Sequence, residues 1–522
     1  MQNRFSRCVA IAIPAVLLAA AAACTKKDEA PKDTLQIQLS SEPVSLDPSL
    51  AEDGLGFRIL INVMDGLVGY TNEGRLVNRL AESYEISEDR KTYRFKLRPD
   101  AVWSDGAAVD ASQFKLALER ALKPATGSKL SGLLRVIRGA SDLVRGTNPH
   151  ASGIVADGRD LTITLEKPAS YFLQVLTLPI AYPLRADVLE RNGGRWDALR
   201  GDRVPTNGAY KFAGYARDQR IELTAHQRLP DGAPRNVLLR IVQDESTGAS
   251  LFERGKLDVL SRIPAYDQKK YEEKGQVRVV PFLATYFLGF NLKKPPFNDR
   301  DFRRALAGAI KKEELVRALG TGETPASSWI PRGLEGYYPY RADAAGVESV
   351  FADSVARVKA RKYPGKIVMG FDSSGRNALV MEKVQSDARA ALGWKVELAN
   401  SDWKSFTKSI YVDPTPVFRF GWSTPMIDPV IFLSAFTTKD PFTFTSYSNP
   451  AYDGLVARIV ALEPGDAERA RLIAQAQKIL VEDEAIVIPL YHYVSTQVVG
   501  PRLAKYEVSP FGHTRYEEVR LK

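Results

Sequence analysis

Alternating apolar and polar positions near the start of the chain predict β-strands. Residues 34–39 place aliphatic side chains on one face and glutamines on the other, which is the pattern of a half-buried strand. Residues 81–98 repeat the alternation on both sides of a polar turn at residues 88–90. That second pattern predicts a β-hairpin.

Helical spacing appears between the predicted strands. Asp110 stands just before Phe114, Leu118 and Leu122, which are four residues apart, so a helix capped by Asp110 is predicted. Residues 376–392 predict a longer helix ended by a glycine. Because single cores stop growing at about 250–300 residues, the 522 residues of this chain predict two or more domains.

The loop after the first strand carries two acids, Glu52 and Asp53, before a helix predicted over residues 57–64. Loops that follow strands are where α/β proteins present ligand-binding groups. Either acid could instead cap the helix, because a carboxylate accepts hydrogen bonds from free backbone amides. Both interpretations are open.

One charged side chain interrupts an apolar stretch late in the chain. Residues 417–420 predict a short buried strand that carries Arg419, followed by a loop over residues 421–425 and a helix beginning near Asp428. A buried guanidinium costs several kcal/mol unless an anion or other acceptors meet it. The pattern therefore indicates either a place where a ligand docks or an internal ion pair.

Composition excludes several kinds of chemistry. The only two cysteines are Cys8 and Cys24, so the folded part has no disulfide and no thiol nucleophile. The four histidines are scattered singly, so no metal centre is expected, and no cofactor is predicted. No nucleophile elbow, zinc-protease motif or phosphate-binding loop occurs. The net charge of +10 is spread along the chain without basic-aromatic blocks, which argues against nucleic acid binding.

The N-terminus has the features of a secretory signal. Arg4 and Arg7 precede an apolar run at residues 9–23, which is too short for a comfortable membrane span. The run ends at Cys24 and resembles a bacterial lipobox, although Ala21 stands where that motif usually has leucine. The resemblance implies a lipidated Cys24, with ordinary cleavage beside an incidental cysteine as the alternative. Residues 1–23 would be removed, and residues 24–33 would form a polar tether.

Several motifs together resemble one family. They are Ala-Glu-Ser-Tyr at residues 81–84, the hairpin, Trp-Ser-Asp-Gly at 103–106 and the helix leading to Pro124. Together they are similar to the extracytoplasmic peptide-binding proteins of ABC importers, the oligopeptide- and dipeptide-binding family. Further similar segments follow in family order at residues 206–210, 220–224, 285–291, 294–299, 402–406, 416–429 and 485–493.

The resemblance implies an α/β chain with the type II periplasmic-binding-protein fold. In that fold two α/β lobes close over a ligand about a hinge, and an extra subdomain is inserted in lobe one. Lobe one would comprise residues 34–68, 204–280 and 494–522, the insert residues 69–203, and lobe two residues 281–493.

The resemblance also implies a site between the lobes. Arg419 matches an arginine that can pair with a ligand carboxylate. Trp403 and Trp422 match aromatic cleft walls, Tyr493 matches a ligand-contacting tyrosine, and Glu52 matches an acid of lobe one at the cleft. The predicted ligand-binding residues are Arg419, Trp422, Trp403, Tyr493, Glu52, Gly421, Ser423 and Asn377.

Two positions depart from the family pattern. Pro425 stands where peptide binders usually have an aspartate for the ligand's α-ammonium group, so Glu52 or Asp428 would have to supply that charge, or the ligand lacks a free amine. Asn377 stands where some oligopeptide binders have a histidine near the ligand's far end. A ligand-length preference therefore cannot be transferred from the family.

The predicted function is that of a non-enzymatic receptor. It would be a monomer at the bacterial periplasm or cell surface, anchored by lipid on Cys24, delivering an oligopeptide-like ligand to an ABC permease. One alternative is a family member that binds a non-peptide or N-blocked anionic solute. Alternatives of another class are an exported hydrolase and an envelope scaffold.

Overall fold

A computed structural model describes most of the chain. The described residues are 31–196, 204–264, 266–438 and 445–522. The predicted signal segment and Cys24 lie outside them. None of the described helices combines the length and apolar character needed to cross a membrane.

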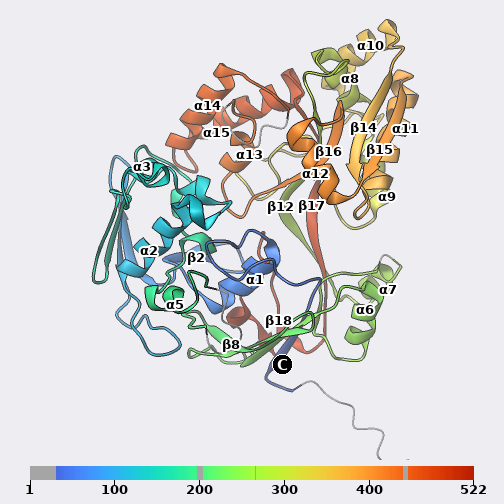
Figure 1. Cartoon of the computed structure of the whole chain (residues 1–522). Helices are drawn as coiled ribbons and strands as arrows, with labels where there is room; N and C mark the ends of the chain where they lie inside the picture. Colours follow the sequence, from blue (N-terminus) through green and yellow to red (C-terminus); the bar gives the residue numbers. More distant parts are fainter. Residues whose placement is uncertain (1–30, 197–203, 265, 439–444) are drawn as a thin grey trace, which may run out of the picture.

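Two long strands run through both bodies of the molecule. β12 (Val277–Phe290) and β17 (Val487–Val499) pair antiparallel and join the lower body to the upper body in Figure 1. Their register shifts between the pairs Pro281–Val494 and Thr285–His492, so three residues of β12 stand opposite Tyr493 alone. The ladder is therefore irregular at the point where the chain passes between the bodies.

The strands on either side of this pair complete the eleven-stranded sheet found in the described residues. Toward the upper edge come β16 (Val417–Ser423), β14 (Lys366–Asp372) and β15 (Lys395–Ser401), and β13 (Thr324–Pro325) pairs with β17. Toward the lower edge come β11 (Val259–Leu260), β1 (Thr34–Leu39), β10 (Asn236–Ile241), β9 (Arg220–Ala225) and β8 (Tyr210–Ala216).

The lower body contains the remaining sheets and the first helices. β4 (Ala81–Ile86), β5 (Thr92–Leu97), β7 (Asp160–Thr164) and β6 (Ile154–Asp157) form one antiparallel sheet, while β2 (Val68–Tyr70) pairs with β3 (Leu76–Asn78) and β18 (Leu503–Lys505) with β19 (Arg520–Leu521). Its helices are α1 (Gly54–Val63), α2 (Ala111–Leu122), α3 (Ala140–Arg145), α4 (Phe172–Val175), α5 (Ala186–Arg191), α6 (Glu245–Glu253) and α7 (Gln268–Glu273).

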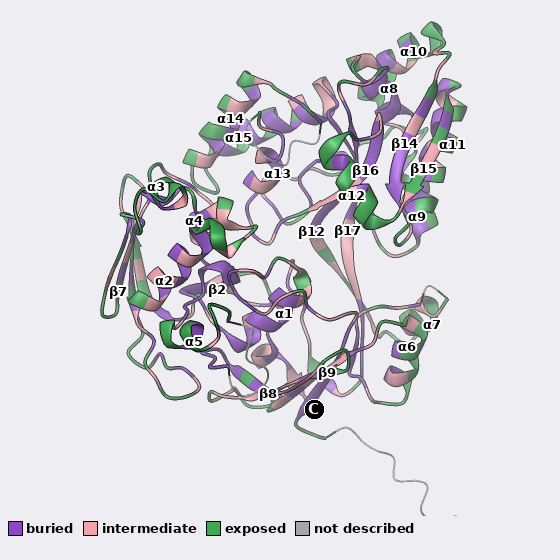
Figure 2. Ribbon diagram, in the orientation of Figure 1, coloured by how far each residue is buried: buried purple, intermediate pink, exposed green. Residues whose placement is uncertain are grey.

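The upper body contains the remaining α-helices of the described residues. These helices are α8 (Arg300–Ala309), α9 (Lys312–Leu319), α10 (Ala352–Arg361), α11 (Asn377–Leu392), α12 (Trp403–Val412), α13 (Val430–Ser434), α14 (Pro450–Ala461) and α15 (Ala467–Gln477). Figure 2 shows buried strand residues inside this body and exposed residues on the outer turns of α10 and α14.

The two bodies have separate hydrophobic cores. Apart from Met426, the largest core draws on residues 35–259 and on the C-terminal tail at 499–519. Apart from Phe511, the next two cores draw on residues 283–491. We call the first body lobe one and the second lobe two. The boundary residues expected from the family resemblance stay a prediction.

Strand β1 differs from its sequence pattern because both of its faces are buried. Gln36 and Gln38, expected on a solvent face, are only 2% and 0% exposed. β1 lies between β10 and β11 in the sheet interior. There the amide of Gln38 donates to the carbonyl of Val242 at 3.0 Å and its oxygen accepts from the backbone of Ser261 at 3.0 Å. Hydrogen bonding allows a polar face to be buried, which alternation alone does not reveal.

Local signals predicted the hairpin and the first helix closely. The hairpin forms from β4 and β5, as expected. Helix α1 begins at Gly54, three residues earlier than the predicted start, because Asp53 caps it. The Asp53 carboxylate accepts from the backbone of Leu55 and Gly56, each at 2.9 Å. Of the two acids in this loop, Asp53 is therefore the cap.

Strand β16 is longer than the predicted strand at residues 417–420. Gly421, Trp422 and Ser423 continue it, since they pair with residues 284–286 of β12. The predicted loop therefore begins later than expected. Helix α13 begins at Val430, whose backbone amide donates to the Asp428 carboxylate at 2.8 Å.

We predict that Asp53→Ala lowers the free energy of unfolding by about 1 kcal/mol, because two amides of α1 lose their acceptor. Glu52→Ala is the matched control, since Glu52 makes an exposed pair with Lys129, and such pairs contribute about 0–1 kcal/mol. Urea titration followed by circular dichroism measures both. A larger loss for Glu52→Ala than for Asp53→Ala would contradict this assignment of the cap.

Candidate ligand-binding site

The centre of the candidate site is strand β16. β12 pairs with it from Val417 to Ser423, whereas β14 pairs with it only at Val417 and Phe418. Beyond Phe418, β12 is the only described strand that accompanies β16. An extended ligand can be added to such a sheet edge through backbone hydrogen bonds.

Arg419 is buried on this strand and forms an ion pair within lobe two. Its guanidinium pairs with the carboxylate of Asp372, the last residue of β14, and the two side chains are 7% and 0% exposed. Pairing with an acid is what the internal-ion-pair interpretation of the sequence expected. The sequence alone did not single out Asp372. Its position at the carboxyl end of a strand could have marked it, because α/β proteins place binding groups there.

The remaining surroundings of Arg419 are mostly aromatic. Its guanidinium carbon lies 5.7 Å from the ring centre of Tyr286, 5.6 Å from that of Trp403 and 5.5 Å from that of Phe406. These are cation–π distances. The buried Nε of Arg419 has no hydrogen-bond partner among the described residues. The guanidinium therefore keeps a donor that an additional acceptor could use, and a role in ligand binding stays a prediction.

Asn377 supports this ion pair from the first turn of α11. Its amide nitrogen donates to the carboxylate and the carbonyl of Asp372, both at 3.2 Å, and its oxygen accepts from the Tyr286 hydroxyl at 3.1 Å. Burial raises the pKa of Tyr286 well above its usual value, so this hydroxyl stays a donor. Asn377 is 7% exposed and acts here through Asp372.

The two candidate tryptophans have different surroundings. Trp403, at the start of α12, is 51% exposed, and its ring stacks on Phe420 with the centroids 6.2 Å apart. Trp422 is half-buried, and its indole nitrogen donates to the carbonyl of Ile431 at 3.2 Å. Trp403 thus offers an open aromatic face, whereas Trp422 also holds the loop that follows β16.

Tyr493 and Gly421 approach each other closely. A Cβ atom added to Gly421 would lie 2.9 Å from the Tyr493 hydroxyl, so a side chain here would displace that tyrosine. Burial raises the pKa of Tyr493 to about 12, and the nearby Arg419 opposes that rise. The hydroxyl is therefore protonated at neutral pH. Ser423, at the end of the same strand, is exposed.

Two acids considered as partners for a ligand amine are already paired. Glu52 binds Lys129 of the same lobe at 2.7 Å. Asp428 binds Arg469 at 2.7 Å, and both of those side chains are 0% exposed. Burial raises the pKa of Asp428, while Arg469 opposes the rise. The structure thus groups Arg419, Asn377, Trp403, Gly421 and Tyr493, and no described contact joins Glu52 to them.

The described residues contain no cluster of three or more histidine, cysteine, aspartate or glutamate side chains suited to a metal ion. The site is built instead from a strand edge, one paired guanidinium and aromatic rings. Such an arrangement suits binding of an extended solute that carries an anionic group.

Comparisons with known proteins agree with this architecture. Residues 75–444 match the family model described as bacterial extracellular solute-binding proteins, family 5. The periplasmic oligopeptide-binding protein OppA of Salmonella typhimurium is 29% identical over 514 residues, covering 94% of this chain and 93% of that protein. The probable deoxycholate-binding periplasmic protein YgiS of Escherichia coli is 25% identical, covering 94% of both chains.

Solved structures show the same fold. The unliganded open form of the periplasmic murein tripeptide-binding protein MppA superposes with a TM-score of 0.78 at 25% identity, covering 94% of this chain and 98% of that chain. Haemophilus influenzae OppA in complex with the peptide RPPGFSPFR gives 0.77 at 26% identity, covering 95% and 100%. The chain therefore belongs to the family 5 bacterial extracellular solute-binding proteins and has the type II periplasmic-binding-protein fold.

Proposed function

We propose that this chain is a lipid-anchored receptor that captures an oligopeptide-like solute between its lobes and delivers it to the permease of an ABC importer. The observation that carries this proposal is the strand edge of β16, which β14 leaves after Phe418. A peptide backbone added there would form a further strand, with its carboxylate directed to Arg419. Relatives named for oligopeptide binding support the ligand class.

The proposed contacts divide by their chemistry. Arg419 would supply a charge-assisted hydrogen bond to a carboxylate, and its unused Nε supports this role. Trp403 presents an exposed ring, and Tyr493 presents a protonated hydroxyl beside Gly421. Backbone recognition along β16, through residues such as Ser423, tolerates many ligand side chains. Glu52 would face the ligand from lobe one only if its bond with Lys129 opened.

Closure of the lobes would place the ligand between them. We propose lobe boundaries near residues 280 and 494, because the β12–β17 register is irregular there. Ladder hydrogen bonds are disrupted at such irregularities, which makes them natural bending points.

A second candidate ligand is an anionic solute that is not a peptide. The exposed ring of Trp403 beside the Arg419 guanidinium would suit an apolar molecule with one carboxylate. The relative named for probable deoxycholate binding supports this possibility.

We predict that Arg419→Ala weakens binding of a peptide with a free carboxylate at least tenfold, because a charge-assisted hydrogen bond contributes about 1.5–3 kcal/mol. The same peptide with a C-terminal amide is the control and should bind the variant and the parent protein alike. Calorimetry measures the four affinities. Equal losses for acid and amide would assign Arg419 a structural role.

We predict that Asp372→Asn strengthens binding of the carboxylate peptide about tenfold, because the ligand no longer competes with a protein carboxylate. The variant should melt at a lower temperature without ligand, since Arg419 loses its counter-charge in a buried position. Glu397→Gln, which removes an exposed acid of the neighbouring strand, is the matched control. Weaker binding by Asp372→Asn would instead make Asp372 an essential positioning group.

We predict that Cys24→Ser moves the protein from the membrane fraction to the soluble fraction, because the proposed lipid is attached through that sulfur. Cell fractionation measures the distribution, and mass spectrometry of the N-terminal peptide identifies the modification. An unmodified Cys24 in the mature protein would refute the anchor without affecting the proposed receptor role.

A further inference from the structure

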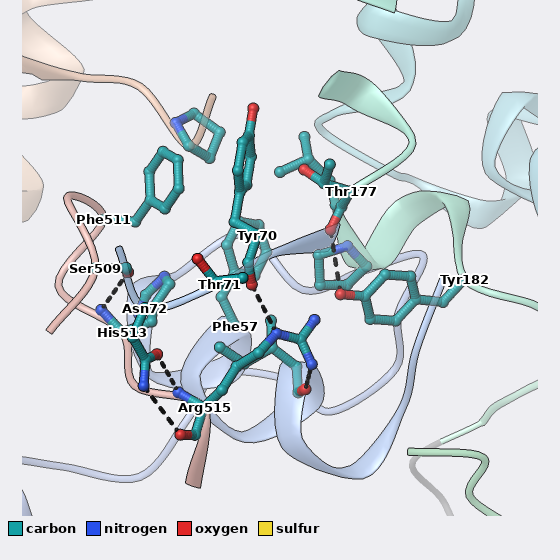
Figure 3. A pocket seen from close by; sticks show the side chains of 14 residues that line it. Phe57, Tyr70, Thr71, Asn72, Thr177, Tyr182, Ser509, Phe511, His513 and Arg515 are labelled. Atoms are coloured by element: carbon teal, nitrogen blue, oxygen red, sulfur yellow. Dashed lines mark hydrogen bonds between the residues drawn. The ribbon is translucent and has the colours of Figure 1, made fainter. Parts of the chain in front are cut away.

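One groove of lobe one shares no lining residue with the proposed binding site. It is formed by α6 and α7, at the lower right of Figure 1, and by the turn before β18. Its volume is about 420 Å³, within the range of about 300–1,000 Å³ that is common for small-molecule sites. The cavity beside Pro425 measures only about 50 Å³ (Figure 3). The charged and amide side chains that line the groove are Glu253, Asp258, Lys270, Lys274, Gln276 and Arg502.

The floor of this groove is apolar and fixed by packing. Phe252 and Tyr271 meet edge to face with their ring centroids 5.7 Å apart, and both side chains are buried. Together with Leu257 they belong to a small core that also includes Leu260 of β11 and Val498 of β17. The groove is therefore built against the main sheet, and its shape does not depend on surface side chains alone.

Both carboxylates of the groove are already engaged. Asp258 accepts a hydrogen bond from the backbone amide of Gln36 at 2.9 Å and pairs with Arg502 at 3.3 Å. Glu253 forms an ion pair with Lys270. The lining contains three cations and two acids, so one positive charge is left over when these pairs have formed.

Lys274 carries the remaining charge. It is exposed at the C-terminal cap of α7, and its side chain forms no ion pair among the described residues. The half-buried side-chain amide of Gln276 likewise has no hydrogen-bond partner in the described part of the chain. Phosphate oxygens accept hydrogen bonds from ammonium and amide groups. The unused donors of the groove therefore suit an anion with several oxygen atoms.

The groove adjoins the place where the described chain begins. Arg502 of its lining donates to the carbonyl of Pro31 at 2.9 Å and to that of Thr34 at 3.3 Å. Cys24 precedes Pro31 by seven residues, which span at most about 25 Å. A lipid on Cys24 would hold this face of lobe one close to the membrane. Because tethering raises the local concentration of headgroups, even a weak contact with them would then form.

We propose, on the basis of the lipid anchor in the proposed function above, that the groove binds the phosphate headgroup of an anionic phospholipid. Lys274 and Gln276 donate to the phosphate oxygens, while Phe252 and Tyr271 lie beneath the glycerol carbons. Anionic bilayer surfaces attract nearby cations, and the attraction falls off within a Debye length. Lobe one thus contacts the membrane through a defined surface in addition to the lipid.

The first test separates the groove from the lipid. The full mature chain with Cys24→Ser, which lacks the attachment sulfur, is sedimented at low ionic strength with vesicles of phosphatidylcholine, alone or mixed with phosphatidylglycerol. Binding should be at least tenfold stronger with phosphatidylglycerol, and Lys274→Glu should abolish that advantage. Lys359→Glu is the matched control, because it reverses an exposed charge of α10 in lobe two, and it should bind like the parent chain.

Other results of this experiment would overturn the lipid assignment. Equal losses for Lys274→Glu and Lys359→Glu would attribute binding to net charge. Release from the vesicles by millimolar inorganic phosphate would make the groove a site for a soluble anion, and self-association lost in Lys274→Glu would make it an interface between two copies. Calorimetry of the same preparations with the carboxylate peptide tests the receptor separately, since failure to bind that peptide would contradict the proposed function and not the groove.

The second test uses the lipidated protein in the same two kinds of vesicle. Amide hydrogen exchange in α7 should be at least fivefold slower with phosphatidylglycerol, because the headgroup covers the end of that helix. Exchange in α10 should be the same in both vesicles. Equal exchange of α7 in the two vesicles would show that the anchored protein does not bind headgroups through this groove.

Discussion

The antiparallel pairing of β12 with β17 is the interaction on which the rest of the structure depends. Its register shifts where residues 282–284 stand opposite Tyr493, and it shifts again within lobe two between the pairs Tyr286–Tyr491 and Phe287–Pro489. Other hydrogen bonds meet at the same place, since Leu283 donates to the carbonyl of Pro510 at 3.1 Å and accepts from the backbone of Thr424 at 3.1 Å. The part of β12 that passes between the lobes is thus hydrogen-bonded to both the C-terminal tail and the loop after β16.

Contacts away from the strands also join the lobes. The backbone of Ser170 in lobe one donates to the carbonyl of Val460 in α14 at 2.8 Å, and Arg90 pairs with Glu463 nearby. The Arg469 guanidinium, fully buried beside Asp428, reaches the Ser170 hydroxyl at 3.3 Å. Opening the lobes would break the contact between Arg469 and Ser170, so this contact influences the balance between open and closed forms.

The two ends of β16 differ in their electrostatics. At one end Arg419 is a cation already neutralised by Asp372, so its attraction for a second carboxylate is limited by competition with the protein's own. At the other end Ser423 is exposed, and Asp428 in the loop that follows is neutralised by Arg469. A solute lying along the strand would therefore meet a cationic contact at one end and an uncharged one at the other. The charge that each end of β16 presents to a solute is therefore set by the ion pair beside that end.

The sequence by itself determined the local features of this protein. The β4–β5 hairpin follows from alternation, and α2 follows from four-residue spacing after Asp110, which caps it as expected. Family motifs, read in order, also identified the fold class. These features depend on residues close together in the chain, which is why a single sequence reveals them.

Only the tertiary structure decided how distant polar groups are paired. It buried the glutamines of β1, joined Arg419 to Asp372 and joined Asp428 to Arg469. It also brought Pro425 against residues of α1, β2 and the C-terminal tail around a small cavity of about 50 Å³. A sequence shows which charges an apolar stretch contains, but a buried charge is stabilised by whichever partner the fold brings within hydrogen-bond distance. Because those partners come from separate elements, no local pattern in the chain specifies them.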